Sequence, residues 1–320
     1  MSCRLTRNLS SFQTTGSCLL FALLLSAGAL TANSAVSGAD KPRENAENSG
    51  VPDVIYPLDE FLDRCLAQPN HGSTASQVEC TDQARQRWDD EMNKDYRRLG
   101  DHLGLKAQAL LRDAQRRWLQ YRDADQLLID AVYELTKGTM FAPMRAYSHL
   151  RLVRERSLML KSYFTVLTNP KARKDLPRAG KEKEDPENSG SSEVDYPIDD
   201  SLDHCIDQHA TPSEQASCVE EALSRWDQAM NAIYQKLTQR LPSKSTLVEA
   251  QRNWLAFRDA EYLLIDSIYE TLPAQEYQPL HAYWRLRLTR ERALLLKKYL
   301  ALAGSEEAGS RRIEHDHVGT

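Results

Sequence analysis

Residues 114–134 read AQRRWLQYRDADQLLIDAVYE, and residues 250–270 read AQRNWLAFRDAEYLLIDSIYE. Fourteen of these 21 positions are identical, at a constant offset of 136 residues. A Tyr-Pro-x-Asp string precedes each stretch, at residues 56 and 196, and an Arg-Glu-Arg string follows each, at residues 154 and 290. Strings repeated in the same order indicate an internal duplication. The sequence therefore predicts two tandem copies of one domain, residues 56–167 and 196–303.

Each copy has the pattern of a helical domain. Thr211, Pro212 and Glu214 form a helix start, because Thr211 can cap, Pro212 suits the first helical position and Glu214 can complete a capping box. Apolar residues then recur three or four positions apart, at Ala222, Trp226, Met230, Ile233, Leu237 and Leu241. The predicted fold is all-α: two tandem elongated helical bundles, each with one short helix and three long helices.

The N-terminus has the features of a signal peptide. Arg4 and Arg7 precede an apolar run at residues 18–30, and small residues follow it. The run is shorter than the roughly 20 apolar residues that a membrane span needs. We expect residues 1–39 to be a signal peptide, cleaved after Ala35 or Ala39, and the product to be periplasmic, without a membrane attachment. An uncleaved N-terminal anchor is the alternative.

Three segments have the composition of disordered chain: residues 40–55, the linker 168–195 and the tail 304–320. They are rich in Pro, Gly, Ser and charge and poor in large apolar residues. Because the linker offers no apolar residues to dock the copies, we expect the two domains to fold and work separately. His315 and His317 in the tail would hold a metal only weakly, so we predict no metal and no cofactor.

Composition limits the classes of function. Hydrophobic residues make up 41% of the chain, enough to build cores, and the net charge of −5 gives no basic footprint for nucleic acid. The sequence contains no nucleophile elbow, zinc-protease motif or phosphate-binding glycine loop. We therefore predict a protein that is not an enzyme and does not bind nucleic acid.

Four cysteines remain after the leader: Cys65, Cys80, Cys205 and Cys218. An even number in an exported chain suggests disulfides. Because the pairs occupy equivalent places in the two copies, we predict bridges Cys65–Cys80 and Cys205–Cys218, with free buried thiols as the alternative. Each bridge would close a loop of about 15 residues and stabilise the fold by about 3 kcal/mol.

Polar residues recur with helical spacing on stripes that also carry tryptophan. The first copy holds these residues at Asp89, Asn93, Gln115, Trp118, Arg122 and Asp123, and the second at Asp227, Asn231, Gln251, Trp254, Arg258 and Asp259. A buried arginine needs an acidic partner, so we expect Asp89 to pair with Arg122 and Asp227 to pair with Arg258. Two interpretations are open: a network that fixes helix register, or a surface that binds a partner.

These motifs resemble the LprI-type lysozyme-inhibitor domain, a small helical domain of secreted and envelope proteins of bacteria. The most specific string is Ala-Gln-x-x-Trp-x-x-x-Arg-Asp, at residues 114–123 and 250–259, and the resemblance covers nearly all of both copies. The family often has a further cysteine shortly after Arg-Asp, where this chain has Asp125, Gln126, Glu261 and Tyr262. A bridge from that place to the last helix is therefore not expected.

The resemblance implies a periplasmic binding protein that inhibits a peptidoglycan hydrolase. The target would be a lysozyme, or a muramidase or other cell-wall toxin delivered by a competitor, in which case the chain is an immunity protein. A non-inhibitory structural or adaptor module of the cell envelope is the alternative. Inhibition requires a rigid surface and no catalytic residue.

Overall fold

The computed structural model describes residues 56–169 and 196–316, with side chains as far as Gly304. In these two ranges every regular element is a helix, and no residue lies in a strand. The first copy contains α1 (Pro57–Leu66), α2 (Thr74–His102), α3 (Leu105–Tyr133), a short 3-10 turn η1 (Thr139–Phe141) and α4 (Ala142–Thr168). The second copy contains α5 (Pro197–Gln208), α6 (Pro212–Arg240), α7 (Lys244–Tyr269) and α8 (Ala274–Asp316). The all-α prediction of one short and three long helices per copy is confirmed.

Local signals in the sequence set the helix ends. Pro57 and Pro197 open the two short helices, where the missing N–H of proline removes no intrahelical bond. The capping box of α6 forms as expected, with Thr211 Oγ1 accepting from the Glu214 backbone N–H at 3.3 Å and Glu214 accepting from the Thr211 N–H. Gly138, at φ 102°, makes the turn between α3 and η1, a conformation that favours glycine.

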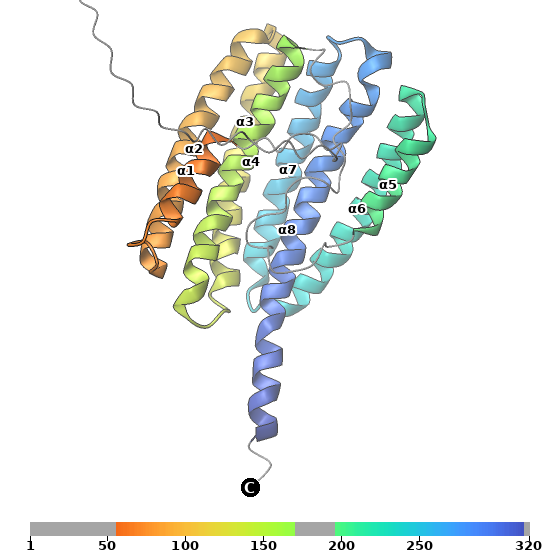
Figure 1. Cartoon of the computed structure of the whole chain (residues 1–320). Coiled ribbons are helices and arrows are strands. Elements are labelled where there is room, and N and C mark those ends of the chain that lie inside the picture. The colour runs from red at the N-terminus through yellow and green to blue at the C-terminus, as the bar shows by residue number, and fades with distance from the viewer. Residues whose placement is uncertain (1–55, 170–195, 317–320) are drawn as a thin grey trace, which may run out of the picture. The chain divides into compact units, whose positions relative to one another are not determined.

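Within each copy the second and fourth helices pack along their lengths, α2 on α4 and α6 on α8 (Figure 1). The tryptophans of both repeated stripes lie inside. Trp88, Trp118, Trp226 and Trp254 are each at most 4% exposed. The helices are therefore amphipathic, and the periodic apolar positions read from the sequence form their buried faces.

The two copies share one hydrophobic core, because α3 of the first copy packs against α7 of the second (Figure 1). Tyr121 on α3 and Phe257 on α7 stack with ring centroids 5.7 Å apart and planes 3° apart. Both copies belong to one compact unit. The expectation that the copies do not dock is therefore wrong, because residues on α3 and α7 pack the copies together.

The last helix also differs from expectation. We expected disorder from Gly304 onward, but α8 continues to Asp316. The predicted signal peptide, the segment before Tyr56, residues 170–195 and the last four residues lie outside the described residues. Where the structure describes the chain, it has no helix long and apolar enough to cross a membrane.

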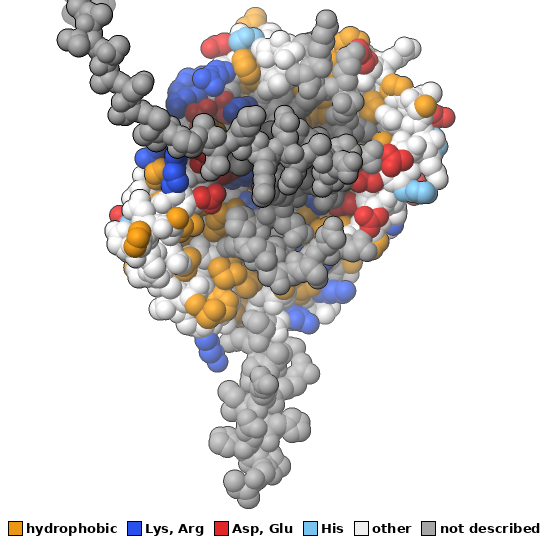
Figure 2. All heavy atoms as spheres, in the orientation of Figure 1, with side chains coloured by type: hydrophobic (Ala, Val, Ile, Leu, Met, Phe, Trp, Pro, Cys, Tyr) orange, Lys and Arg blue, Asp and Glu red, His pale blue; other side chains and the backbone are white. Residues whose placement is uncertain are grey.

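Figure 2 shows the surface of the face that carries α4 and α8 in the view of Figure 1. In its visible, described part, basic, acidic and hydrophobic side chains are interspersed. This mixed surface agrees with a chain whose net charge is only −5, and charge over that face gives no reason to expect long-range steering.

Candidate functional site

A disulfide fastens the short helix of each copy to the next helix. Cys65 bonds Cys80, and Cys205 bonds Cys218, with Cα–Cα distances of 5.8 and 5.9 Å. Both predicted bridges are confirmed. Disulfides are typical of proteins outside the cytoplasm, where the environment is oxidising.

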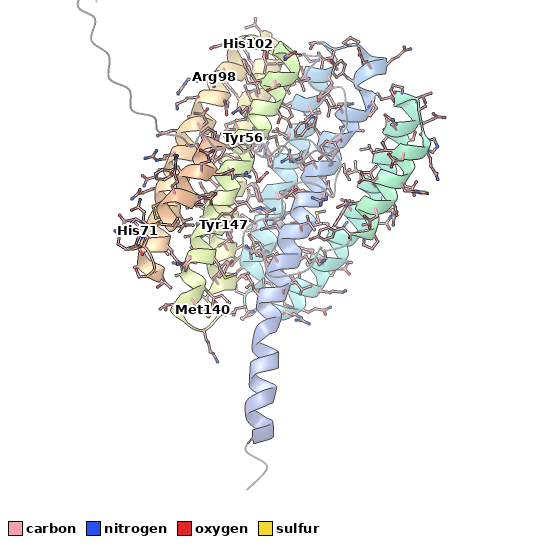
Figure 3. All side chains as sticks on the ribbon, in the orientation of Figure 1. Tyr56, His71, Arg98, His102, Met140 and Tyr147 are labelled. Atoms are coloured by element: carbon pink, nitrogen blue, oxygen red, sulfur yellow. A yellow bond between two sulfur atoms is a disulfide. The ribbon has the colours of Figure 1, made fainter. Side chains whose placement is uncertain are left out.

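A histidine accompanies each bridge. His71 Nδ1 donates to the Cys65 carbonyl at 2.8 Å and lies 3.2 Å from Cys80 Sγ, and His209 makes the same 2.8 Å bond in the second copy. Figure 3 places His71 at the far end of α1 from Tyr56. Cys-His groups of this kind bind metals through thiolates, and bridged cysteines have none. With the disulfides formed, these histidines serve to hold the helix end.

The repeated Tyr-Pro-x-Asp and Arg-Glu-Arg strings meet in space. Arg154 on α4 donates two hydrogen bonds to Asp59 on α1, at 2.9 and 2.7 Å, and Arg290 on α8 donates to Asp199 on α5 at 2.8 Å. Burial acts to lower the pKa of Arg154, but Asp59 outweighs it, and the pKa is raised. These pairs hold the short helices against the last helix of each copy.

Arg156 on α4 and Arg292 on α8 each form an ion pair with a carboxylate of the other copy. Arg156 on α4 donates to Glu261 on α7 at 2.7 Å, and both side chains are fully buried. The same guanidinium donates through Nε to Gln115 Oε1 at 2.9 Å and lies over the Phe257 ring at 5.3 Å. Arg156 thus joins three long helices, two from its own copy and one from the other.

The reciprocal bridge comes from the second copy. Arg292 on α8 donates to Asp125 on α3 at 2.6 Å, to Gln251 at 3.0 Å, and covers the Tyr121 ring at 5.5 Å. Tyr299 donates to the other oxygen of Asp125 at 3.0 Å. Burial acts to lower the pKa of Arg292, but Asp125, Tyr121 and Tyr299 together outweigh burial and raise the pKa. We call the two crossed pairs the buried interlock.

A second, partly exposed set of charges surrounds the buried interlock. Arg151 on α4 donates to Glu291 on α8 at 2.8 Å, and Arg287 on α8 donates to Glu155 on α4 at 3.2 Å. Burial raises the pKa of Glu155, whereas Arg151 and Arg287 outweigh burial at Glu291 and lower its pKa. The pKa values of these two carboxyls are therefore shifted in opposite directions within one cluster, where the carboxyls titrate together and not independently.

The motif arginines pair differently from our prediction. Arg122 donates to its neighbour Asp123 at 2.7 Å, and Arg258 donates to Asp259 at 2.8 Å. Asp89 instead accepts from Asn93 at 3.2 Å, and Asp227 lies 3.9 Å from Arg258. The prediction of an Asp89–Arg122 pair is wrong, whereas the predicted ion pair of Asp227 with Arg258 forms, although its N–O distance of 3.9 Å is longer than that of the Arg258–Asp259 pair.

The arginines pair with exposed neighbours because their own side chains are only partly buried. The side chains of Arg122 and Arg258 are 25% and 22% exposed, and each guanidinium lies 5.4 Å from the ring of its own stripe, Trp118 or Trp254. The tryptophans are buried, but the arginines at the rim reach the surface, where they need no buried acid. Among the arginines that the structure describes, the fully buried ones are Arg156 and Arg292.

The motif residues form an exposed stripe on each central helix. On α3 it contains Leu119, Arg122, Asp123 and Leu127, and on α7 it contains Leu255, Arg258, Asp259 and Leu263. Because Arg122 follows Tyr121 and Arg258 follows Phe257, the stripes flank the stacked rings where α3 meets α7. Leu127 and Leu263 are 61% and 56% exposed. We call this surface the α3–α7 face.

A groove between α2 and α3 borders the α3–α7 face. It has a volume of about 400 Å³ and is lined by Asp89, Met92, Asn93, Tyr96, Arg112, Gln115, Arg116, Leu119 and Arg122. The structure therefore brings the predicted residues Asp89, Asn93, Gln115 and Arg122 together in one open site. We call it the α2–α3 groove.

The four residues of the buried interlock are not among the predicted site residues. Arg156 and Arg292 belong to the repeated Arg-Glu-Arg strings, and Asp125 and Glu261 stand where the family often has a cysteine. The spacing of residues around Arg156 nevertheless predicts that this arginine is buried. Arg156 stands four residues from both Leu152 and Leu160, on the stripe that should face the core. A charge at a core position predicts a buried partner.

Fold and site together define a class: a tandem, disulfide-pinned helical protein whose two copies share a core. Comparison with known families then narrows this class. The family described as lysozyme inhibitor LprI matches residues 65–160 and 205–296, more than half of the chain. The chain therefore belongs to the LprI lysozyme-inhibitor family, with one match in each copy. A search among curated proteins found no match.

Among solved structures, the chain is similar to an uncharacterized protein from Burkholderia thailandensis, known from a crystal structure. The two are 29% identical with a TM-score of 0.53, over 77% of this chain and 97% of that chain. Because neither copy makes up half of the chain, the similarity extends over both copies. The tandem architecture is thus shared with a protein whose structure was determined by experiment.

Proposed function

We propose that this protein is a periplasmic inhibitor of a peptidoglycan hydrolase, either a lysozyme or a cell-wall toxin delivered by a competitor. The observation that carries the proposal is the family match in both copies, each of which includes the Ala-Gln-x-x-Trp-x-x-x-Arg-Asp string. The predicted signal peptide supports export, and the two disulfides fit an oxidising compartment. The proposal requires no cofactor, metal, nucleic acid or catalytic residue.

The α3–α7 face is the surface that we propose contacts the hydrolase. It combines exposed leucines with arginine and aspartate, and exposed apolar patches rimmed by polar residues mark protein-binding sites. The buried interlock fixes α3 against α7, so the face is preorganised. A preorganised surface loses little conformational entropy on binding, which favours tight inhibition.

A turbidity assay with bacterial cell walls tests the proposal. The exported chain is mixed with each of several c-type, g-type and bacterial muramidases, with heat-denatured protein as a blank. We expect at least one enzyme to lose activity at stoichiometric inhibitor. If no enzyme is inhibited, and a pull-down from periplasm and host secretions recovers no hydrolase, the chain is instead a structural or adaptor module of the envelope.

A matched pair of variants tests the surface. Leu127→Asp combined with Leu263→Asp places two charges on the α3–α7 face, and we expect inhibition to weaken at least tenfold. Leu66→Asp is the control, because Leu66 is 39% exposed on α1, which packs on α2 and is not part of the α3–α7 face. Equal inhibition by both variants would show that the hydrolase binds elsewhere.

A further inference from the structure

The residues that line the α2–α3 groove recur in the second copy, with one exception. Arg112 lines the groove of the first copy, and Val248 occupies the equivalent position, 136 residues on, in the second copy. The other lining residues are identical at equivalent positions. The duplication therefore supplies an internal comparison, because the first set of residues contains the guanidinium of Arg112 and the second set lacks it.

The α2–α3 groove carries more arginines than carboxylates along its lining. Arg112, Arg116 and Arg122 line it, against the single carboxylate of Asp89. Arg116 and Arg122 have exposed neighbouring acids, Asp113 and Asp123, but within the described part of the chain no carboxylate lies within 4.0 Å of Arg112. Arg112 therefore offers a guanidinium with its full donor capacity toward the groove.

The groove also presents an amide donor whose orientation is fixed. Gln115 Oε1 accepts from the buried Arg156 at 2.9 Å, and because a guanidinium can only donate, the amide oxygen must face Arg156. The amide nitrogen is then directed to the groove side, where its contact is the sulfur of Met92 at 3.8 Å. A thioether is a weak acceptor, so a stronger acceptor from a ligand would improve the hydrogen bonding of this nitrogen.

We propose that the α2–α3 groove binds a carboxylate-bearing segment of the protein partner, and that the equivalent residues of the second copy do not. Guanidinium groups bind carboxylates through paired, charge-assisted hydrogen bonds, and the Gln115 amide adds a neutral donor at the same place. A groove of about 400 Å³ has room for a few side chains. This inference rests on the proposed function, because it names the chemistry by which the hydrolase is held.

A labelled hexaglutamate peptide is the probe, with hexaglutamine as its neutral control. The exported full chain is titrated at low salt and followed by fluorescence anisotropy, and by NMR of methionine methyl groups. We expect hexaglutamate alone to bind, more weakly at higher salt, and to shift the methyl signal of Met92 but not that of its counterpart Met230. Equal binding of hexaglutamine, or equal shifts at both methionines, would overturn the proposal.

Exchange of the one differing residue provides the decisive comparison. We expect Arg112→Val to weaken hexaglutamate binding about tenfold, and Val248→Arg to create a second site that now shifts Met230. Lys94→Glu is the charge control, because it lies about 140° around α2 from Asp89, and it should bind as wild type. Unchanged binding by Arg112→Val would contradict the proposal, as would tighter binding of inorganic phosphate or of soluble peptidoglycan fragments than of hexaglutamate.

Failure of this inference and failure of the proposed function are distinguishable. A wild-type chain that inhibits a hydrolase, with the same potency in Arg112→Val, would overturn the role of the groove and leave the inhibitor function standing. Hexaglutamate binding that depends on Arg112, in a chain that inhibits no hydrolase, would uphold the groove and remove the inhibitor function.

Discussion

Removal of Asp125 should cost far more stability than removal of Asp123, two residues earlier on the same helix. Asp125 is 0% exposed and accepts from both Arg292 and Tyr299, whereas the side chain of Asp123 is 64% exposed and pairs only with Arg122. In Asp125→Ala the guanidinium of Arg292 stays buried without its counter-ion. Breaking one partner of a buried pair costs about 3–5 kcal/mol, and a surface pair contributes about 0–1 kcal/mol.

Thermal unfolding followed by circular dichroism measures the difference. For a folded unit of this size each kcal/mol changes Tm by about 2–4 °C, so Asp125→Ala should melt about 6–20 °C lower. Asp123→Ala should stay within about 0.5 kcal/mol of wild type. The double variant Asp125→Leu with Arg292→Met should recover most of the loss, because an apolar pair removes the unpaired charge. An Asp125→Ala protein as stable as Asp123→Ala would refute the buried interlock.

Three further predictions concern stability and assembly. The fragment 51–170 should be a dimer by light scattering. Asp125 is the first-copy equivalent of Glu261, so it can pair with Arg156 of another molecule of the fragment. A well-folded monomer would contradict the shared core. Arg258→Ala should lower stability by only about 1 kcal/mol and not the 3–5 kcal/mol of a buried pair, as a melting curve can show, since Arg258 pairs with the exposed Asp259. Burial raises the pKa of Asp95 despite its hydrogen bond to Ser157. The stability that this carboxyl contributes is therefore full below its unfolded pKa and is lost as pH rises through its folded pKa. Asp95→Ile combined with Ser157→Ala, which introduces the residues of the second copy, should abolish that part of the pH dependence of urea unfolding.

The parts of the fold that depend on local pattern could be predicted from the sequence. Several signals act within a few residues of the chain: the capping box at Thr211, the prolines that open helices and the apolar period. These signals therefore predict the helices and their order. The disulfides followed from the duplication, because equivalent cysteines are expected to form equivalent bonds.

The contact between the copies could not be read from the linker. The composition of the linker says nothing of α3 and α7, whose Tyr121 and Phe257 look like ordinary core residues of a single bundle. The pairing of Arg122 was predicted incorrectly for the same reason, because it too depends on how the helices pack. Helical spacing places Arg122 beside a buried tryptophan, yet only the packed structure shows that its guanidinium reaches the rim, while that of Arg156 does not.

The most direct test of the account is the endpoint of a titration of a susceptible muramidase with the exported chain. Residual activity is measured at enzyme concentrations well above the dissociation constant, so that the break in the curve reports stoichiometry. Because both motif stripes belong to one α3–α7 face, the account predicts a linear fall to a sharp endpoint at one chain per enzyme. Activity that stays unchanged across all muramidases tested, at any excess of the folded chain, would contradict it.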